Sequence, residues 1–149
     1  MTYFEDLTTY SYIPENKGAL LNVGWLDAEH EYPKGAISDE FIEKLAWLCV
    51  NAPVKGTPGI HSCSLCPPMR FGFHMINRKG SQLILGSAEI HVKSLNATYA
   101  SPDLILHYTM EHGYRPPADF IAGVLMLEAG LPRPQWTLTR GPHWGGGLK

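Results

Sequence analysis

The sequence has few charged residues and no excess of positive ones. Charged side chains make up 17% of the 149 residues, and the formal net charge is -2. Proteins that bind nucleic acids neutralise the phosphate backbone with clustered Lys and Arg side chains. Because no such cluster occurs here, we expect no nucleic-acid partner.

An export signal and a membrane span are also lacking. Residues 1–6 have neither the charged nor the apolar region of a signal peptide, and no run of about eighteen apolar residues occurs. The three cysteines are an odd number, which argues against a secreted disulfide framework. The sequence therefore predicts a cytoplasmic protein with reduced thiols and no membrane partner. It does not indicate an oligomeric state.

Length and hydrophobicity suit one α+β domain. Hydrophobic residues make up 44% of the chain, which is enough to bury a core, and no linker divides it. We expect a single domain over residues 1–149. It would have an irregular, aromatic N-terminal segment over 1–18 and an extended tail over 132–149.

Alternating hydrophobic residues predict a small antiparallel β-meander. A strand is expected over residues 19–26, and a hairpin is expected to join strands over 70–76 and 82–92. A short strand over 98–100 would follow. Gly86 lies inside the second hairpin strand, where glycine indicates a bulge or a close backbone approach.

Capping patterns predict about three helices packed with this sheet. Ser38 can cap a helix that ends near residue 51, before a proline. Residues 101–103 read Ser-Pro-Asp, a typical helix start, and that helix would run to residue 112. A third helix would lie within 115–130. Cys49 falls on the apolar face of the first helix, so we expect it to be a buried core residue.

The proline-rich stretch 53–69 has no helical or strand periodicity. A loop of this length in a compact domain needs something to hold it in place. It contains Cys63 and Cys66 at C-x-x-C spacing, with His61 two residues before them. A C-x-x-C turn can direct two thiolates toward one ion, and thiolate with imidazole is the ligand set that zinc prefers.

A pair of histidines follows about forty residues later, at positions 107 and 112. Residues five apart on a regular helix point about 140° away from one another. Both imidazoles can reach one ion only if the helix unwinds at His112, where the next residue, Gly113, favours a helix end. His61 competes with His112 for the fourth ligand position. The predicted Zn²⁺ ligands are Cys63, Cys66, His107, His112 and His61.

The sequence leaves the role of this zinc open. Four protein ligands would make a closed structural site, whereas three ligands and a water would make a reactive one. The leading interpretation is a non-enzymatic zinc-binding domain that acts through a protein partner. The alternative is a zinc-dependent hydrolase-type enzyme with Glu89 or Glu111 as its base, and a redox dithiol comes third. The zinc-deaminase and H-E-x-x-H signatures are both absent.

Several motifs together resemble an uncharacterised family of small bacterial proteins, a domain of unknown function. They are residues 1–7, 22–27 and 85–90, the H-x-C-x-x-C motif at 61–66, and the H-Y-x3-H-x-Y-x-P-P motif at 107–117. The likeness extends to about residue 129. It implies a free-standing cytosolic protein and supplies no activity.

Overall fold

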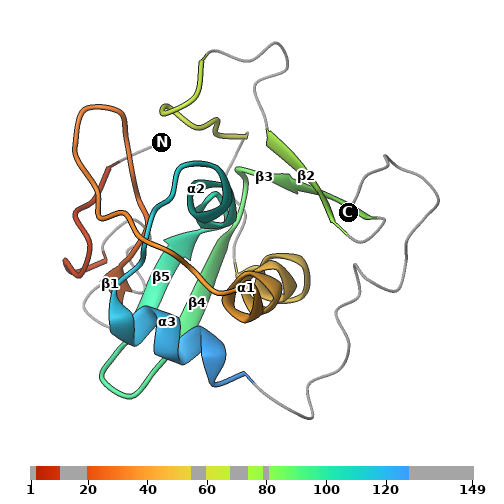
Figure 1. Ribbon diagram of the computed structural model, residues 1–149. Coiled ribbons are helices and arrows are strands. Elements are labelled where there is room, and N and C mark those ends of the chain that lie inside the picture. Colours follow the sequence, from red (N-terminus) through yellow and green to blue (C-terminus); the bar gives the residue numbers. More distant parts are fainter. Residues whose placement is uncertain (1–2, 11–19, 55–59, 68–73, 79–80, 128–149) are drawn as a thin grey trace.

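The computed structural model describes residues 3–10, 20–54, 60–67, 74–78 and 81–127 (Figure 1). Several of the expected features lie outside these residues in whole or in part. They are the tail over 132–149, the end of the third helix near residue 130, the first residues of the 70–76 strand, residue 19 of the 19–26 strand, and parts of the N-terminal segment over 1–18 and of the proline-rich stretch over 53–69.

Two small sheets account for the named strands. In the three-stranded sheet, β5 (Thr98–Pro102) lies in the middle, parallel to β1 (Leu21–Asn22) and antiparallel to β4 (Glu89–Lys93). A separate antiparallel hairpin consists of β2 (His74–Arg78) and β3 (Ser81–Leu85). The predicted α+β class is confirmed. The strands of the expected meander are divided between these two sheets.

The strand expected over 82–92 is broken at Gly86. The Gly86 N–H donates to a carboxylate oxygen of Asp103 at 2.8 Å, and its carbonyl accepts the His61 N–H at 2.7 Å. Its φ is +116°, and a Cβ there would collide with the His61 carbonyl oxygen, so only glycine fits. The predicted close backbone approach is confirmed, and it separates β3 from β4.

The first predicted helix is confirmed as α1 (Asp39–Asn51). The Ser38 hydroxyl accepts the Phe41 N–H at 3.1 Å, which caps the helix. Cys49 is buried on the inner face of this helix, as predicted. Among the helices in the described ranges, none has the length and hydrophobicity of a membrane span.

The predicted start of the second helix at residues 101–103 is wrong. Ser101 and Pro102 belong to β5, opposite Ile90 and Glu89, and α2 runs only from Ile105–Glu111. Strand pairing outweighs the local helix-start pattern because both residues are buried against β4. The third helix, α3 (Ala118–Leu125), lies inside the predicted range.

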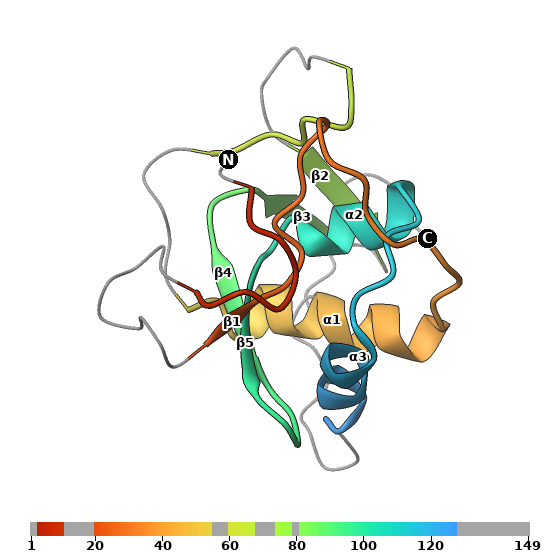
Figure 2. The same cartoon turned by 90° about the vertical axis from the view of Figure 1, so that its left-hand side faces the viewer.

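The central sheet is covered on both faces (Figures 1 and 2). Ile90 and Val92 of β4 join the main core, to which the three helices contribute. The alternate residue Glu89 instead contacts Tyr10 of the N-terminal segment. Tyr10 also packs in a second cluster with Trp25. The main core therefore lies between the sheet and the helices, and it includes Cys63 of the loop over 60–67.

The strand expected over residues 19–26 is shorter than predicted. Only Leu21–Asn22 pairs with β5 as a strand. Gly24 adopts a left-handed φ of +81°, and its N–H donates to the Asp6 carboxylate at 3.0 Å. This conformation interrupts the extended backbone. Trp25 then pairs with Phe4 through an isolated bridge.

The hydrogen bonds of Gly86 to His61 and Asp103 are here called the Gly86 junction. Substitution of Asp103 tests how this junction contributes to stability. Burial raises its pKa from 3.8 to about 6. Between these two pH values the folded state binds more protons than the unfolded state, so folding stability falls as pH rises through this window. Asp103→Asn keeps an oxygen acceptor for the Gly86 N–H and removes the charge.

We expect the stability of Asp103→Asn, relative to wild type, to rise by about 2 kcal/mol between pH 4 and pH 7, since the pKa shift is roughly two units and the unfolded carboxyl is already partly ionised at pH 4. Urea unfolding of both proteins across this range measures the difference. Parallel stability curves for the two proteins would contradict the prediction.

Candidate metal centre

The C-x-x-C loop is held in a tight turn by backbone hydrogen bonds. The Leu65 N–H donates to the Cys63 sulfur at 3.3 Å, and the Cys66 N–H reaches the Cys63 carbonyl at 3.4 Å. The Cys63 N–H donates to Nε2 of His74 at 2.9 Å. These contacts, with the His61 hydrogen bond to Gly86, place both sulfurs beside α2.

The two histidines come from α2 and from its C-terminal end. His107 lies within the helix and is 7% exposed. His112 is the C-cap residue, with φ -117° and ψ 7°, and Gly113 follows with φ +67°. The predicted unwinding at His112 is therefore confirmed. It lets an imidazole five residues after His107 turn toward the same point, with 5.0 Å between the two ring centroids.

Four side chains converge at this point: Cys63, Cys66, His107 and His112. Their ligand atoms all lie within 4.8 Å of one another. The Cys66 sulfur lies 3.3 Å from Nε2 of both histidines, and the Cys63 sulfur lies 3.5 Å from Nε2 of His112. Tetrahedral zinc, with bonds of about 2.3 Å to sulfur and 2.0–2.1 Å to nitrogen, sets sulfur and nitrogen roughly 3.6 Å apart. The four residues fit a metal ion.

The electrostatics of the cluster also suit a cation. Burial and the nearby imidazoles of His74 and His112 lower the pKa of His107 to about 4, so this imidazole is neutral at pH 7 and offers a lone pair. Burial raises the pKa of the Cys63 thiol to about 11. Only a nearby positive charge would hold that sulfur as a thiolate at neutral pH, and a bound metal supplies one.

Residues outside the cluster hold its members in position. The His74 ring packs against the His107 ring, with 4.2 Å between the ring centroids, and Nε2 of His74 accepts the Cys63 N–H. The Tyr32 hydroxyl donates to the His112 carbonyl at 3.0 Å. Sequence reasoning missed His74 and Tyr32. The only available signal for His74 was a histidine within a hydrophobic strand.

A family model described as a domain of unknown function (DUF7919) matches residues 2–125. The chain belongs to this family. The match covers most of the chain, including all four clustered residues, and confirms the resemblance to a family of unknown function. No curated protein and no solved structure matches the chain.

The other residues singled out from the sequence lie apart from the four-residue cluster in this family member. His61 contributes its backbone N–H to Gly86, and its imidazole is not part of the group. The Tyr10 hydroxyl donates to the two carboxylate oxygens of Glu89 at 2.7 and 2.9 Å, and Glu111 is exposed. Among the described residues, neither carboxylate is grouped with the cysteines and histidines.

The Gly86 junction leads to a prediction about this centre. Gly86→Ala should displace the His61 backbone, and with it the cysteine loop, because a Cβ at Gly86 collides with the His61 carbonyl. Gly113→Ala is the control for a left-handed glycine: its φ of +67° lies in the region that other residues can enter at a cost, and no atom beyond its chain neighbours lies within 4 Å of the new Cβ.

Gly113→Ala should cost only the strain of a left-handed residue, about 1–2 kcal/mol. We expect Gly86→Ala to be destabilised more than this and to bind Co²⁺, an optical probe of tetrahedral thiolate sites, at least about tenfold more weakly. Urea unfolding and Co²⁺ titration measure both effects. Equal losses in the two variants would show that backbone strain alone, and not the loop contact, is responsible.

Proposed function

We propose that this protein is a zinc-binding domain whose zinc is structural and which acts through a protein partner. The observation that carries the proposal is the convergence of two sulfurs and two imidazole nitrogens at distances suited to tetrahedral zinc. Two thiolates and two neutral imidazoles are typical of structural zinc sites. Zinc bound here would join the proline-rich loop to the end of α2.

A closed set of ligands argues for a structural role over a catalytic one. A hydrolase would need an open coordination position and a base beside it. Here four protein side chains would fill the tetrahedral shell of a bound zinc, Glu89 accepts the Tyr10 hydroxyl, and Glu111 is exposed. No described contact therefore favours the hydrolase alternative. With no reactive position at the metal, the protein would act through its surface.

Two free thiols held as metal ligands require a reducing environment. Cys63 and Cys66 are free cysteines, as is Cys49. The proposal therefore includes a cytoplasmic location. Because the sequence resembles a family of small bacterial proteins, we propose that the cell is bacterial. In that setting, zinc binding would also protect the C-x-x-C sulfurs from oxidation to a disulfide.

Purified protein should contain one zinc per chain, and Cys63→Ser should abolish this stoichiometry. Binding free energy at a structural metal site contributes directly to folding, so we expect Cys63→Ser to lose several kcal/mol of stability. Elemental analysis and thermal unfolding, with and without a chelator, measure the two effects. Wild-type protein without zinc, with Cys63 and Cys66 freely titratable, would contradict the proposal.

Cys49→Ala is the matched control for this experiment. Cys49 is 5% exposed and packs in the core, outside the four-residue cluster. Removing its sulfur should lower stability through lost packing, by about 1 kcal/mol, while the zinc content stays at one per chain. A parallel loss of zinc in both variants would mean that general unfolding, and not the missing ligand, releases the metal.

A further inference from the structure

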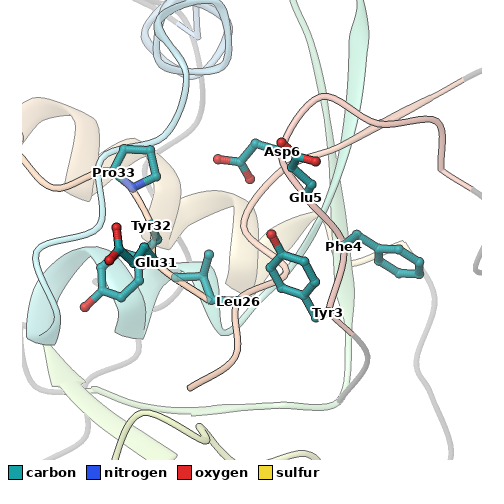
Figure 3. Close-up of a pocket in the computed structure, with 8 residues that line it drawn as sticks. All are labelled: Tyr3, Phe4, Glu5, Asp6, Leu26, Glu31, Tyr32 and Pro33. Carbon is teal, nitrogen blue, oxygen red and sulfur yellow. The ribbon is translucent and has the colours of Figure 1, made fainter. Parts of the chain in front are cut away.

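A small pocket, whose lining includes none of the four clustered residues, lies between the N-terminal segment and residues 31–33 (Figure 3). Tyr3 and Asp6 lie on one side, Glu31 and Tyr32 lie on the other, and the buried Leu26 lies between them. The volume is about 200 Å³, below the roughly 300–1,000 Å³ of sites for drug-sized ligands. The pocket therefore suits one long side chain better than a whole cofactor.

The charge of the pocket has one sign. Glu5, Asp6 and Glu31 contribute three carboxylates, and none of the described residues that line the pocket is a Lys, Arg or His. Glu5 and Glu31 are exposed at the rim and form no ion pair with a described residue. One positive charge lies beside the lining: Nζ of Lys34 is 5.1 Å from the Tyr32 ring centroid, although Lys34 does not itself line the pocket. A cation that enters from outside would therefore share Tyr32 with Lys34 and meet no other positive charge from the lining.

Asp6 is fixed in place by hydrogen bonds and forms no ion pair with any residue that the structure describes. One of its carboxylate oxygens accepts the Gly24 N–H at 3.0 Å, and the other accepts the Tyr114 hydroxyl at 2.8 Å. Burial raises the pKa of this carboxyl despite both hydrogen bonds. In Figure 3 the carboxylate points toward the side formed by residues 31–33. A positive group in the pocket would compensate for the lost hydration.

The two tyrosine rings are also held in position. Tyr3 stacks on His30 with 3.8 Å between ring centroids and an angle of 5° between the rings. Tyr32 is anchored by its hydrogen bond to the His112 carbonyl and by an edge contact with Tyr114, 6.1 Å between centroids. Because these rings are already ordered, binding a flat cation against them would cost little side-chain entropy.

We propose that this pocket binds the guanidinium group of an arginine side chain on a partner protein. The proposal rests on the role in partner binding suggested above. A guanidinium group stacks on aromatic rings and donates paired hydrogen bonds to carboxylates, and the pocket offers both kinds of contact within one side-chain volume. An ammonium group is a compact, strongly hydrated charge that uses the flat rings less well.

Titration of the zinc-loaded protein with Nα-acetyl-arginine amide, followed by amide NMR, tests the proposal. We expect saturable shifts at Tyr3, Glu31 and Tyr32, with a dissociation constant on the order of 1–10 mM for a single side chain. Nα-acetyl-citrulline amide, which has nearly the same shape without the charge, should not bind. Nα-acetyl-lysine amide should bind more weakly than the arginine compound.

The double variant Glu5→Gln with Glu31→Gln should weaken arginine-amide binding by about fivefold or more, because two partly exposed charge contacts are lost. Glu29→Gln is the matched control, since Glu29 is exposed on the same loop and lies outside the pocket. It should leave the affinity unchanged. All three substitutions are at exposed sites, and the NMR spectra report whether each variant keeps the fold.

Four results would overturn the assignment. They are non-saturating shifts with the arginine compound, equal binding of the citrulline compound, equal binding of the lysine compound, and an equal effect of the pocket and control variants. Zinc content measured on the same samples keeps the two proposals apart. A protein that holds zinc but does not bind the arginine amide refutes the pocket assignment and leaves the metal centre intact.

Discussion

The convergence of Cys63, Cys66, His107 and His112 is the constraint on which the rest of the structure depends. It joins a proline-rich stretch, whose sequence has no helical or strand periodicity, to the end of a helix about forty residues later in the chain. A metal at this point would act as a cross-link, and its binding energy would be folding energy. Without a cation, the cluster would leave the buried Cys63 thiol beside two imidazoles, with little to order the loop.

The backbone junction at Gly86 connects this centre with the sheet. Its carbonyl receives the His61 N–H, and its own N–H donates to the Asp103 carboxylate. Asp103 directly follows β5, and its backbone N–H bonds to the carbonyl of Ala88. The same few hydrogen bonds therefore separate β3 from β4, hold the cysteine loop, and fix Asp103 just before the start of α2. The position of both cysteines depends on a residue that contributes no ligand.

The segment after α2 links the metal centre to the acidic pocket. His112 is a member of the cluster, and its carbonyl accepts the Tyr32 hydroxyl. Two residues later, the Tyr114 hydroxyl donates to Asp6. The helix end that presents an imidazole to the metal thus also fixes a ring and a carboxylate that line the pocket. A structural zinc could order a binding surface in this way without taking part in the contact.

The sequence by itself determined the α+β class, the extent of α1, the pairing of the hairpin strands, the glycine position at 86 and three members of the cluster, Cys63, Cys66 and His107. These features follow from local physics: hydrophobic periodicity, side-chain capping, and the few ligand types that suit a soft cation. Only the tertiary structure decided that residues 101 and 102 belong to a strand, because pairing with β4 outweighs a capping preference. It also placed His112 in the cluster in preference to the His61 imidazole, since the helix unwinds there while the backbone at residue 61 is held at Gly86. Such choices depend on contacts between residues far apart in the chain, which no local pattern encodes.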